Sequence, residues 1–315
     1  MRKLTLLFLV LILTTVLTFT TAAAEKGEGG ILKIGIGMDV KQLDPAYISD
    51  LPSERVAKQI HDYLLRRTPD GEVKPNLARD WKVTNDTKVW TFYLKEGVHF
   101  TDGSELTADV VKWHFDRLRD PEVGSNYVEQ FSVIKEVKAV DKYTVKFILK
   151  RSYGPFVQNI LFSPGGLIPS KKHFEEVGPD GYASNPVGTG PFKFAEWKSG
   201  SYIKLVKNED YHLKDVKLDG LRFQPIPEPM TRIIELQTGG VDVVKSIPYQ
   251  NVEKLEKDDG VKMYTGKSGF YVMYIWFNVE DHSSFSDNLP LRTAVSYSIN
   301  KQELAEVVNG KYAIR

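Results

Sequence analysis

The spacing of apolar residues along the chain predicts strands that interleave with helices. Runs in which apolar residues are consecutive, or alternate with polar ones, are typical of strands with two buried faces or one. The predicted strands cover residues 31–37, 90–94, 143–150, 192–197, 201–207 and 241–244. The fourth and fifth of these flank Lys198-Ser199-Gly200, whose turn composition predicts a hairpin.

Helices are predicted where apolar residues fall three or four positions apart. The first is expected from about Ser53 to Arg67. Its apolar face is formed by Val56, Ile60, Tyr63 and Leu64. The other predicted helices cover residues 108–119, 230–237, 290–299 and 301–308. Strands and helices interleave without a strict βαβ rhythm and without a tandem repeat, so the expected fold class is mixed α/β.

Composition is that of an ordinary soluble globular protein. The chain has 315 residues, of which 42% are hydrophobic, with 42 Lys and Arg against 41 Asp and Glu. The near-zero net charge argues against nucleic acid as a partner, because nucleic-acid binders carry a basic face or stripe. The absence of cysteine excludes disulfides, Cys-ligated metal sites and thiol nucleophiles, and no cofactor is expected.

The N-terminus has the three parts of a secretory signal peptide. Arg2 and Lys3 precede an uncharged stretch, residues 4–20, and Ala22-Ala23-Ala24 follows it. We expect residues 1–24 to be removed by cleavage after Ala24, with a permanent N-terminal anchor as the alternative. No cysteine follows the stretch, so we expect a periplasmic or extracellular protein that is not a Cys-anchored lipoprotein.

Motifs for enzyme chemistry find little support. Gly266-Lys267-Ser268 resembles the end of a P-loop, but the position that requires the first glycine is Val261. Gly-x-Ser-x-Gly and His-Glu-x-x-His do not occur, and we expect the six scattered histidines to be surface or capping residues. Carboxylate pairs such as Glu209-Asp210 leave a secreted glycosidase open as an alternative, because sequence gives no distance between carboxylates.

Five blocks of sequence, in order, carry a resemblance to a known family. They are LDPAYISDLPSERVAKQIHDYLLRRTPDGEVKPNLARDW, WTFYLKEGVHFTDGSELTADVV, NPVGTGPFKFAEW, IIELQTGGVDVV and FNVEDHSSFSDNLPLRTAVSYSINKQEL. From about Gly30 onward, the chain closely resembles the extracellular solute-binding proteins of family 5. These are the peptide-, nickel- and oligosaccharide-binding components of ABC importers.

The resemblance implies a type-2 periplasmic-binding-protein fold, with two lobes, an extra domain inserted in the first lobe, and ligand trapped by hinge closure. The main lobe is then expected at residues 25–67 and 185–264, and the inserted domain at 68–184. The second lobe would begin at residues 265–315. Because family members are usually longer, we expect that lobe to be incomplete and the chain alone to bind ligand poorly.

The resemblance also implies which residues face the ligand. The cleft candidates are Ser49, Asp50, Leu51, Pro52, Tyr127, Phe270, Tyr274 and Trp276. The first four match the ligand-facing loop after the first strand, and Tyr127 matches a second cleft position. The three aromatic residues at 270–276 belong to a predicted strand in which the family places cleft aromatics, although packing of a strand core explains them equally well.

The stretch NPVGTGPFKFAEW is expected to be the return crossing from the inserted domain into the main lobe. Its crossing residues are Asn185, Pro186, Gly188, Gly190 and Pro191. A phosphate cradle would have to open a helix, whereas this stretch leads into a predicted strand. We expect the prolines to stiffen the path and the glycines to adopt backbone angles that other residues avoid.

The sequence therefore predicts a secreted binding protein that does no chemistry itself and holds no metal. It would capture an oligopeptide or oligosaccharide and deliver it to ABC permease subunits in the membrane. Peptide is the favoured ligand class, with sugar and metal chelate as alternatives. The rival functions are the secreted hydrolase and a peptide-sensing or chaperone-like protein that works without a transporter.

Overall fold

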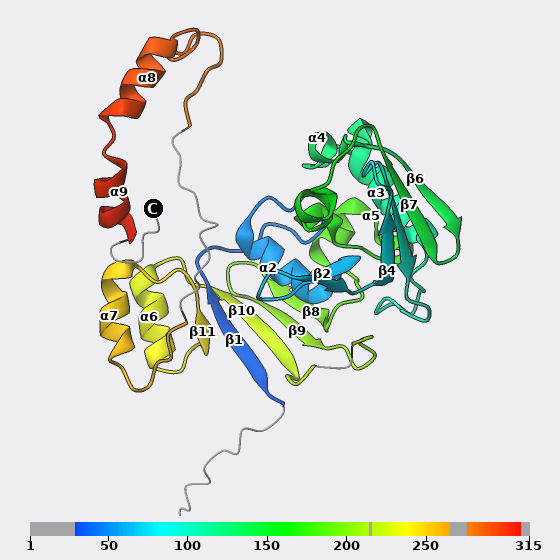
Figure 1. Ribbon diagram of the computed structural model, residues 1–315. Helices are drawn as coiled ribbons and strands as arrows, with labels where there is room; N and C mark the ends of the chain where they lie inside the picture. The colour runs from blue at the N-terminus through cyan, green and yellow to red at the C-terminus, as the bar shows by residue number, and fades with distance from the viewer. Residues whose placement is uncertain (1–28, 214–215, 265–275, 310–315) are drawn as a thin grey trace, which may run out of the picture.

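The computed structural model describes residues 29–213, 216–264 and 276–309 (Figure 1). The predicted signal peptide, residues 1–24, and the cleft candidates Phe270 and Tyr274 lie outside these ranges. Across the described ranges, no helix is both long and apolar enough to cross a bilayer.

A five-stranded sheet, in the order β11-β1-β10-β9-β8, forms the lower part of the molecule in Figure 1. Its strands are β1 (Ile31–Ile36), β8 (Phe192–Lys198), β9 (Tyr202–Lys207), β10 (Gly220–Pro225) and β11 (Val243–Val244). β1 pairs in parallel with β10 and β11, whereas β9 is antiparallel to both of its neighbours. The predicted β8–β9 hairpin is confirmed, and the strand predicted at 241–244 is shorter than expected.

The first described helix, α2 (Leu51–Ile60), lies over this sheet (Figure 1). The Asp50 carboxylate caps it by accepting a hydrogen bond from the Ser53 backbone N–H at 2.8 Å. Val56, Ala57 and Ile60 are fully buried, in a core that they share with residues of β8, β9 and β10. Burial of this apolar face fixes the helix on the sheet.

The helix predicted at 53–67 was wrong at its C-terminal end, because α2 ends at Ile60. From there on, backbone carbonyls accept hydrogen bonds from residues that are distant in the sequence. The Ile60 carbonyl accepts from the Gly190 N–H, and the Leu64 carbonyl accepts from the Ala78 N–H, each at 2.8 Å. The next residues form β2 (Leu65–Arg67), which pairs antiparallel with β3 (Val73–Pro75).

A second, four-stranded antiparallel sheet has the order β4-β5-β7-β6. Its strands are β4 (Ala78–Val83), β5 (Val89–Leu94), β6 (Ile134–Asp141) and β7 (Thr144–Leu149). Helix α3 (Ala108–Arg119) packs against β6 and β7. In the core between the helix and the sheet, the ring of Phe147 packs edge to face against both Phe92 and Phe115. This is one of the preferred arrangements of aromatic rings.

Further helices complete this part of the molecule. They are the 3-10 helices η1 (Pro121–Val123) and η3 (Pro164–Gly166), the π-helix η2 (Val157–Leu161), and the α-helices α4 (Val128–Phe131) and α5 (Lys171–Ser184). All of them fall within residues 68–184, as does the four-stranded sheet. The apolar cores of the two sheets are separate clusters. The boundaries of an inserted domain at 68–184 stay a prediction.

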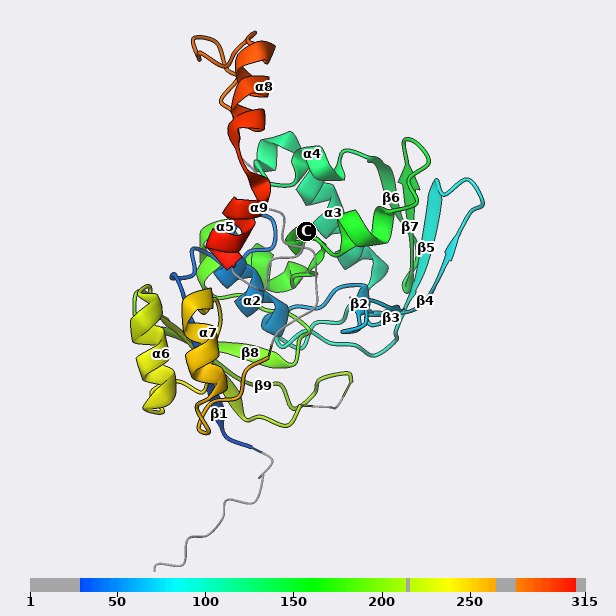
Figure 2. The ribbon, with the colours of Figure 1, turned by 60° about the vertical axis from the view of Figure 1, so that its left-hand side comes forward.

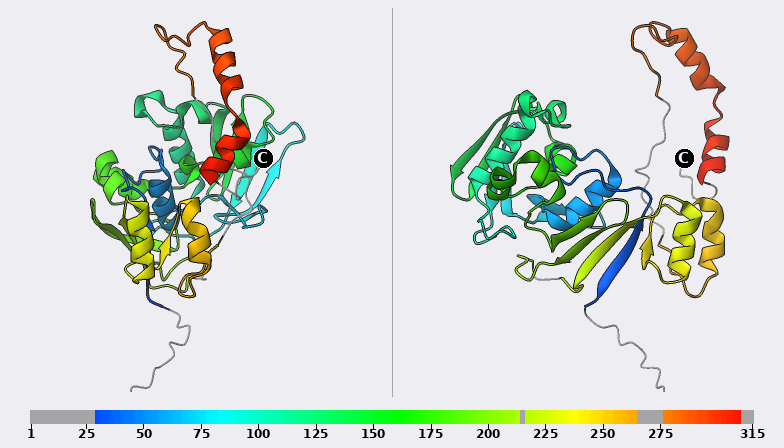
Figure 3. Two further views of the ribbon diagram at one scale, coloured as in Figure 1. Left: turned by 90° about the vertical axis from the view of Figure 1, so that its left-hand side faces the viewer. Right: turned by 180° about the vertical axis from the view of Figure 1, so that it is seen from behind.

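Four helices follow β10. They are α6 (Pro229–Gln237), α7 (Tyr249–Glu256), α8 (Leu289–Ser298) and α9 (Lys301–Asn309). Helices α6 and α7 lie beside β11, and α8 stands clear of both sheets (Figures 2 and 3). The helices predicted at 230–237, 290–299 and 301–308 are therefore confirmed to within about one residue at either end.

The crossing segment, residues 185–191, lies against the end of α2. The Gly190 N–H donates to the Ile60 carbonyl, and the Gly190 carbonyl accepts from the Asn208 side-chain amide, each at 2.8 Å. The Gly188 carbonyl accepts from the Thr101 N–H at 3.0 Å. The segment is thus hydrogen-bonded to the end of α2, to the loop after β9, and to the part of the chain that carries the four-stranded sheet.

The two crossing glycines are needed for a different reason from the expected one. Neither has a positive φ, so backbone angles do not require glycine there. A Cβ on Gly188 would instead lie 2.1 Å from the Ile60 carbonyl oxygen, and a Cβ on Gly190 would lie 2.6 Å from the Ile60 carbonyl carbon. Glycine is required because two stretches of backbone touch.

Gly190→Ala is expected to lower the free energy of unfolding by about 1–3 kcal/mol, because the added methyl group would push the crossing segment off α2. Gly154→Ala is the matched control, since nothing lies within 4 Å of a Cβ added at that position. It should change the free energy by less than about 0.5 kcal/mol. Urea unfolding of both variants measures the difference, and equal losses would contradict the explanation.

Candidate functional site

The carboxyl ends of the parallel strands β1, β10 and β11 meet at one edge of the main sheet. In open α/β sheets, ligands bind in the crevice outside these strand ends. The loop after β1 leads from this edge into α2, and the Lys41 N–H donates to the Ser53 hydroxyl in the first turn of α2 at 3.1 Å. Met38, at the start of the loop, is half exposed. This edge is the candidate ligand site.

The loop Ser49–Pro52 lies at the start of α2, and only part of it is free to contact a ligand. The Asp50 carboxylate is engaged by the Ser53 N–H and by the Ser53 hydroxyl, both at 2.8 Å. Pro52 is buried. Ser49 is exposed, and Leu51 exposes 51% of its surface.

Tyr127 is brought against this loop. Its hydroxyl donates to the Ile48 carbonyl, and its ring packs on Gly165, where a Cβ would lie 2.9 Å from a ring carbon. Burial raises the pKa of the phenol, and the charges of Glu54 and Asp50 raise it further. Tyr127 therefore stays protonated, and in this arrangement its hydroxyl supports the loop.

The remaining candidates are placed as follows. Trp276 lies between the undescribed stretch 265–275 and α8, with 82% of its surface exposed. Asn185 caps the end of α5, and its carbonyl accepts from the His173 ring at 2.8 Å. The Pro191 carbonyl accepts from the Asn208 N–H at 2.9 Å, and Pro186 is buried. The structure brings Tyr127 together with Ser49–Pro52; their ligand-binding role stays a prediction.

A buried ion pair that the sequence did not indicate holds the loop before Ser49. The Arg117 guanidinium donates two hydrogen bonds to the Asp44 carboxylate, one of them at 3.1 Å, and both side chains are buried. The guanidinium also lies 4.2 Å from the centre of the Phe174 ring. The same carboxylate accepts from the Ala46 N–H at 3.0 Å, so the pair fixes the backbone path of the loop.

Asp62, just after α2, accepts hydrogen bonds from four side chains. The donors are Asn76 at 3.0 Å, Thr189 at 3.1 Å, Tyr211 at 3.3 Å and His212 at 3.2 Å. The Lys95 ammonium lies 3.5 Å from the other nitrogen of His212. No periodic pattern in the sequence indicates this cluster, because the four donors come from three separate stretches of the chain.

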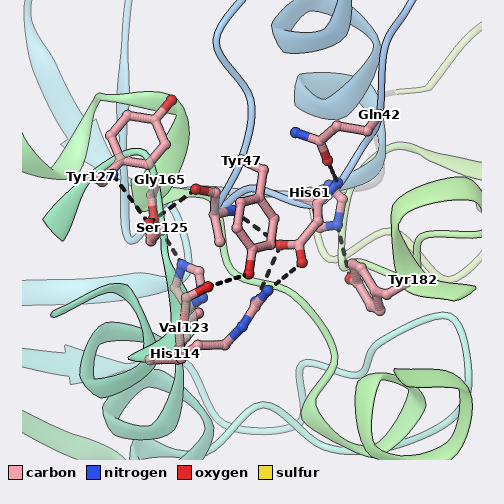
Figure 4. A network of polar contacts seen from close by, with 12 residues as sticks. Gln42, Tyr47, His61, His114, Val123, Ser125, Tyr127, Gly165 and Tyr182 are labelled. Atoms are coloured by element: carbon pink, nitrogen blue, oxygen red, sulfur yellow. Dashed lines mark hydrogen bonds and ion pairs between the residues drawn. The ribbon is translucent and has the colours of Figure 1, made fainter. Parts of the chain in front are cut away.

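Two histidines are buried. His61 is the C-cap of α2, in line with the expectation of surface or capping histidines, whereas His114 lies inside α3 and departs from it. The Nδ1 of His61 donates to the Ala57 carbonyl at 3.1 Å, and Nε2 lies 3.0 Å from the Tyr182 hydroxyl (Figure 4). Nε2 of His114 donates to the Gly165 carbonyl at 2.7 Å. Burial lowers the pKa of His61 to about 4 and that of His114 to about 3, so both rings are neutral near pH 7.

A large hollow lies elsewhere in the described part of the chain. It has a volume of about 1000 Å³ and is lined by Tyr47, Trp113, Phe174 and charged residues of α3. It is open to solvent on the outer side of α3 and α5, so we place the site by strand topology and not by size. Nowhere in the described ranges do three His, Asp or Glu side chains cluster as metal ligands would.

Comparison with known proteins identifies the family. The model of the bacterial extracellular solute-binding proteins, family 5 (middle), matches residues 72–315. The chain belongs to this family. The predicted resemblance is confirmed, and because the family consists of binding proteins and not enzymes, the secreted hydrolase is excluded.

Several relatives of this family-5 chain have been characterised. It is 32% identical over 284 residues to the glutathione-binding protein GsiB of Salmonella paratyphi A, a match that covers 89% of this chain and 54% of the relative. The periplasmic binding protein DppA from Helicobacter pylori, in complex with the peptide STSA, matches with a TM-score of 0.77. Its identity is 27%, over 90% of this chain and 59% of DppA.

A third relative is MoaA from A. tumefacien R10, in complex with mannopinic acid. It matches with a TM-score of 0.68 and 29% identity, over 73% of this chain and 48% of MoaA. The predicted mixed α/β fold of the periplasmic-binding-protein type is confirmed by these similarities. The family-5 chain spans about half the length of the curated relatives it matches.

The stability of this family-5 chain is expected to fall as the pH drops from about 6.5 towards 4. His61 and His114 have folded-state pKa values of about 4 and about 3, below the ordinary value of 6.5. The unfolded chain therefore binds these protons first, and acid favours it by about 1.4 kcal/mol per pH unit for each histidine. Urea unfolding between about pH 7 and pH 5 measures the slope.

Two variants separate the contribution of His61 to this pH dependence from that of the other titrating groups. His61→Gln should remove about half of the slope that the two buried histidines give to the unfolding free energy against pH, because His61 no longer titrates while His114 still does. His99→Gln, at an exposed position, should leave the slope as it is. A His61→Gln slope equal to that of the parent would show that the buried ring does not account for the acid sensitivity.

Proposed function

We propose that this chain is part of a substrate-binding protein of an ABC importer, and that its solute is peptide-like. The observation that carries the proposal is family membership across residues 72–315. Two of the relatives described above carry peptide-type names, the glutathione-binding GsiB and the peptide complex of DppA. Mannopinic acid in MoaA keeps a non-peptide solute as the second candidate.

The candidate site suits a protein that binds without reacting. The edge at the ends of β1, β10 and β11 offers exposed apolar groups, Met38 and Leu51, beside exposed backbone and hydroxyl groups. Apolar contacts with a few polar groups are the usual lining of a small-molecule site. Asp50 caps α2 and Asp44 is paired with Arg117, so neither of these carboxylates is free for acid–base chemistry.

Binding would be coupled to closure of a second lobe over this edge, with residues 265–315 at its start. A ligand shifts the open–closed equilibrium only by as much as it binds the closed form more tightly. The closed, loaded form would then dock on permease subunits in the membrane. The main lobe at residues 25–67 and 185–264, and the crossing at Asn185–Pro191, belong to the same proposal.

A thermal-shift screen tests the ligand class. Peptides of about two to nine residues, oligosaccharides and opine-type acids are offered to the protein expressed at the full length of its gene. A solute bound only by the native state at 100 times its Kd adds about 2.7 kcal/mol of stability, which raises the unfolding midpoint. A peptide is expected to give the shift; a shift with sugars alone would overturn the peptide assignment.

The position of the site is tested with a pair of substitutions at half-exposed apolar residues. Leu51→Ala should reduce the peptide-induced shift, because Leu51 lies at the start of α2 beside the proposed ligand. Val140→Ala, on β6 of the other sheet and 54% exposed, should leave the shift unchanged. Equal shifts in the two variants would place the peptide away from the start of α2.

A further inference from the structure

The face of the main sheet that points away from α2 carries three basic side chains. Successive side chains alternate between the two faces of a sheet, so residues next to core positions point to the opposite face. On β1, β9 and β10 the positions that form the core shared with α2, or pack against it, are Leu32, Ile34, Ile203, Leu205, Leu221 and Phe223. Lys33 of β1, Lys204 of β9 and Arg222 of β10 alternate with them and therefore lie on the other face.

These three cations stand directly opposite one another on neighbouring strands. The backbone register sets Lys33 opposite Arg222, and Arg222 opposite Lys204. None of them forms an ion pair with another described residue, and the Arg222 guanidinium lies instead 4.1 Å from the centre of the Tyr202 ring. Like charges directly opposite each other destabilise a sheet. A row of three such charges calls for an explanation.

The acidic residues near the row are already engaged. Glu196 of β8, opposite Lys204, is paired with Lys198 at 3.3 Å and accepts from the Tyr202 hydroxyl at 2.9 Å. Asp219 and Asp242 accept from the backbone N–H groups of residues 30 and 33, each at 2.7 Å. The row therefore keeps a surplus of positive charge.

Apolar residues lie beside the cations on the same face. In the neighbouring row, Ile31 is opposite Gly220, and Gly220 is opposite Val206. Ile31 exposes 47% of its surface and Val206 exposes 36%. Along β9 and β10, α2 lies on one side of the sheet and no described helix covers the other side (Figures 1 and 3). The face thus presents cations next to exposed apolar groups.

The spread of the charges indicates the kind of partner. Three neighbouring strands span about 10 Å, which is wider than a single carboxylate or phosphate group, so the row fits a surface that carries many anions. Basic side chains together with exposed apolar ones are the combination by which proteins attach to the surface of an anionic bilayer. An acidic protein surface would use the cations but not Ile31 and Val206.

We propose that this face of the main sheet binds the surface of an anionic lipid bilayer. Lys33, Lys204 and Arg222 would contact headgroup phosphates, and Ile31 and Val206 would contact the apolar boundary beneath them. The proposal rests on the proposed function, because a binding protein that serves a membrane permease gains from staying beside the membrane. A few cations bind a bilayer weakly, and salt screens the attraction.

Sedimentation with lipid vesicles tests the proposal on the protein expressed at the full length of its gene. We expect binding to phosphatidylcholine vesicles that contain about 30% phosphatidylglycerol, and not to vesicles of phosphatidylcholine alone. The binding should be lost when salt is raised from about 0.05 M to about 0.5 M. Equal binding to both kinds of vesicle would show that an apolar segment such as residues 4–20 is responsible, and would overturn the proposal.

A pair of double variants locates the contact. Lys33→Gln with Lys204→Gln should weaken binding to the anionic vesicles about tenfold or more. The unfolding midpoint of this variant should stay the same or rise, because like charges across the strands are removed. Lys138→Gln with Lys146→Gln is the matched control, since these lysines also face each other, on β6 and β7 of the other sheet, and their loss changes the net charge equally. It should leave vesicle binding unchanged, and an equal loss in both variants would contradict the proposal.

The outcomes separate the bilayer contact from the proposed function. If a peptide raises the unfolding midpoint and no vesicle is bound, the bilayer contact is wrong and the proposed function stands. If vesicles bind and no solute shifts the midpoint, the proposed function fails and the bilayer contact stands. Binding of soluble polyglutamate without binding of vesicles would assign the face to an acidic protein partner and overturn the proposal. A loss of vesicle binding confined to Lys33→Gln with Lys204→Gln supports it.

Discussion

The contact between the Ile60 carbonyl and the crossing segment is the constraint on which the arrangement of the chain depends. The last carbonyls of a helix have no partner within the helix and must find one elsewhere. Here the Gly190 N–H supplies it, and both crossing glycines leave room for the approach. One hydrogen bond thus ends α2 and also sets where the chain returns to start β8.

The buried charged groups near this contact determine the path of the chain more than they add to its net stability. Removing ions from water is costly, so a buried pair such as Asp44 with Arg117 adds little to stability overall. Each buried charged group finds its hydrogen-bond partners in only one arrangement of the chain, however. Asp44 orients the loop that leads to Ser49. Asp62 accepts hydrogen bonds from four side chains near the crossing segment. We infer that these groups specify a single path for the loop and the crossing.

Much of the fold could be predicted from the sequence, because apolar periodicity reports burial directly. The β8–β9 hairpin and helices α6, α8 and α9 follow from local patterns, whereas α7 was not predicted. The end of α2 could not be predicted, because Leu64 continues the apolar period while its backbone pairs with Ala78. The role of Gly188 was missed for a related reason: sequence shows that a glycine is present, but not which neighbour requires it.

The candidate site was less predictable than the fold. Family resemblance indicated Ser49–Pro52 and Tyr127, whose proximity no spacing rule implies. Asp62 and Arg117 were missed because their partners lie far away in the sequence, 73 residues in the case of the ion pair.

The donors to Asp62 also have a consequence for the order of folding. They lie 14, 127, 149 and 150 residues after it in the chain. Strand β1 likewise pairs with β10, which lies far along the sequence. All strands of the four-stranded sheet, in contrast, belong to one continuous stretch, residues 78–149. Contacts that are near in sequence form faster than distant ones. We therefore expect the middle of the chain to fold first and its N-terminal strand and helix, though made earliest, to be among the last parts to reach their final positions.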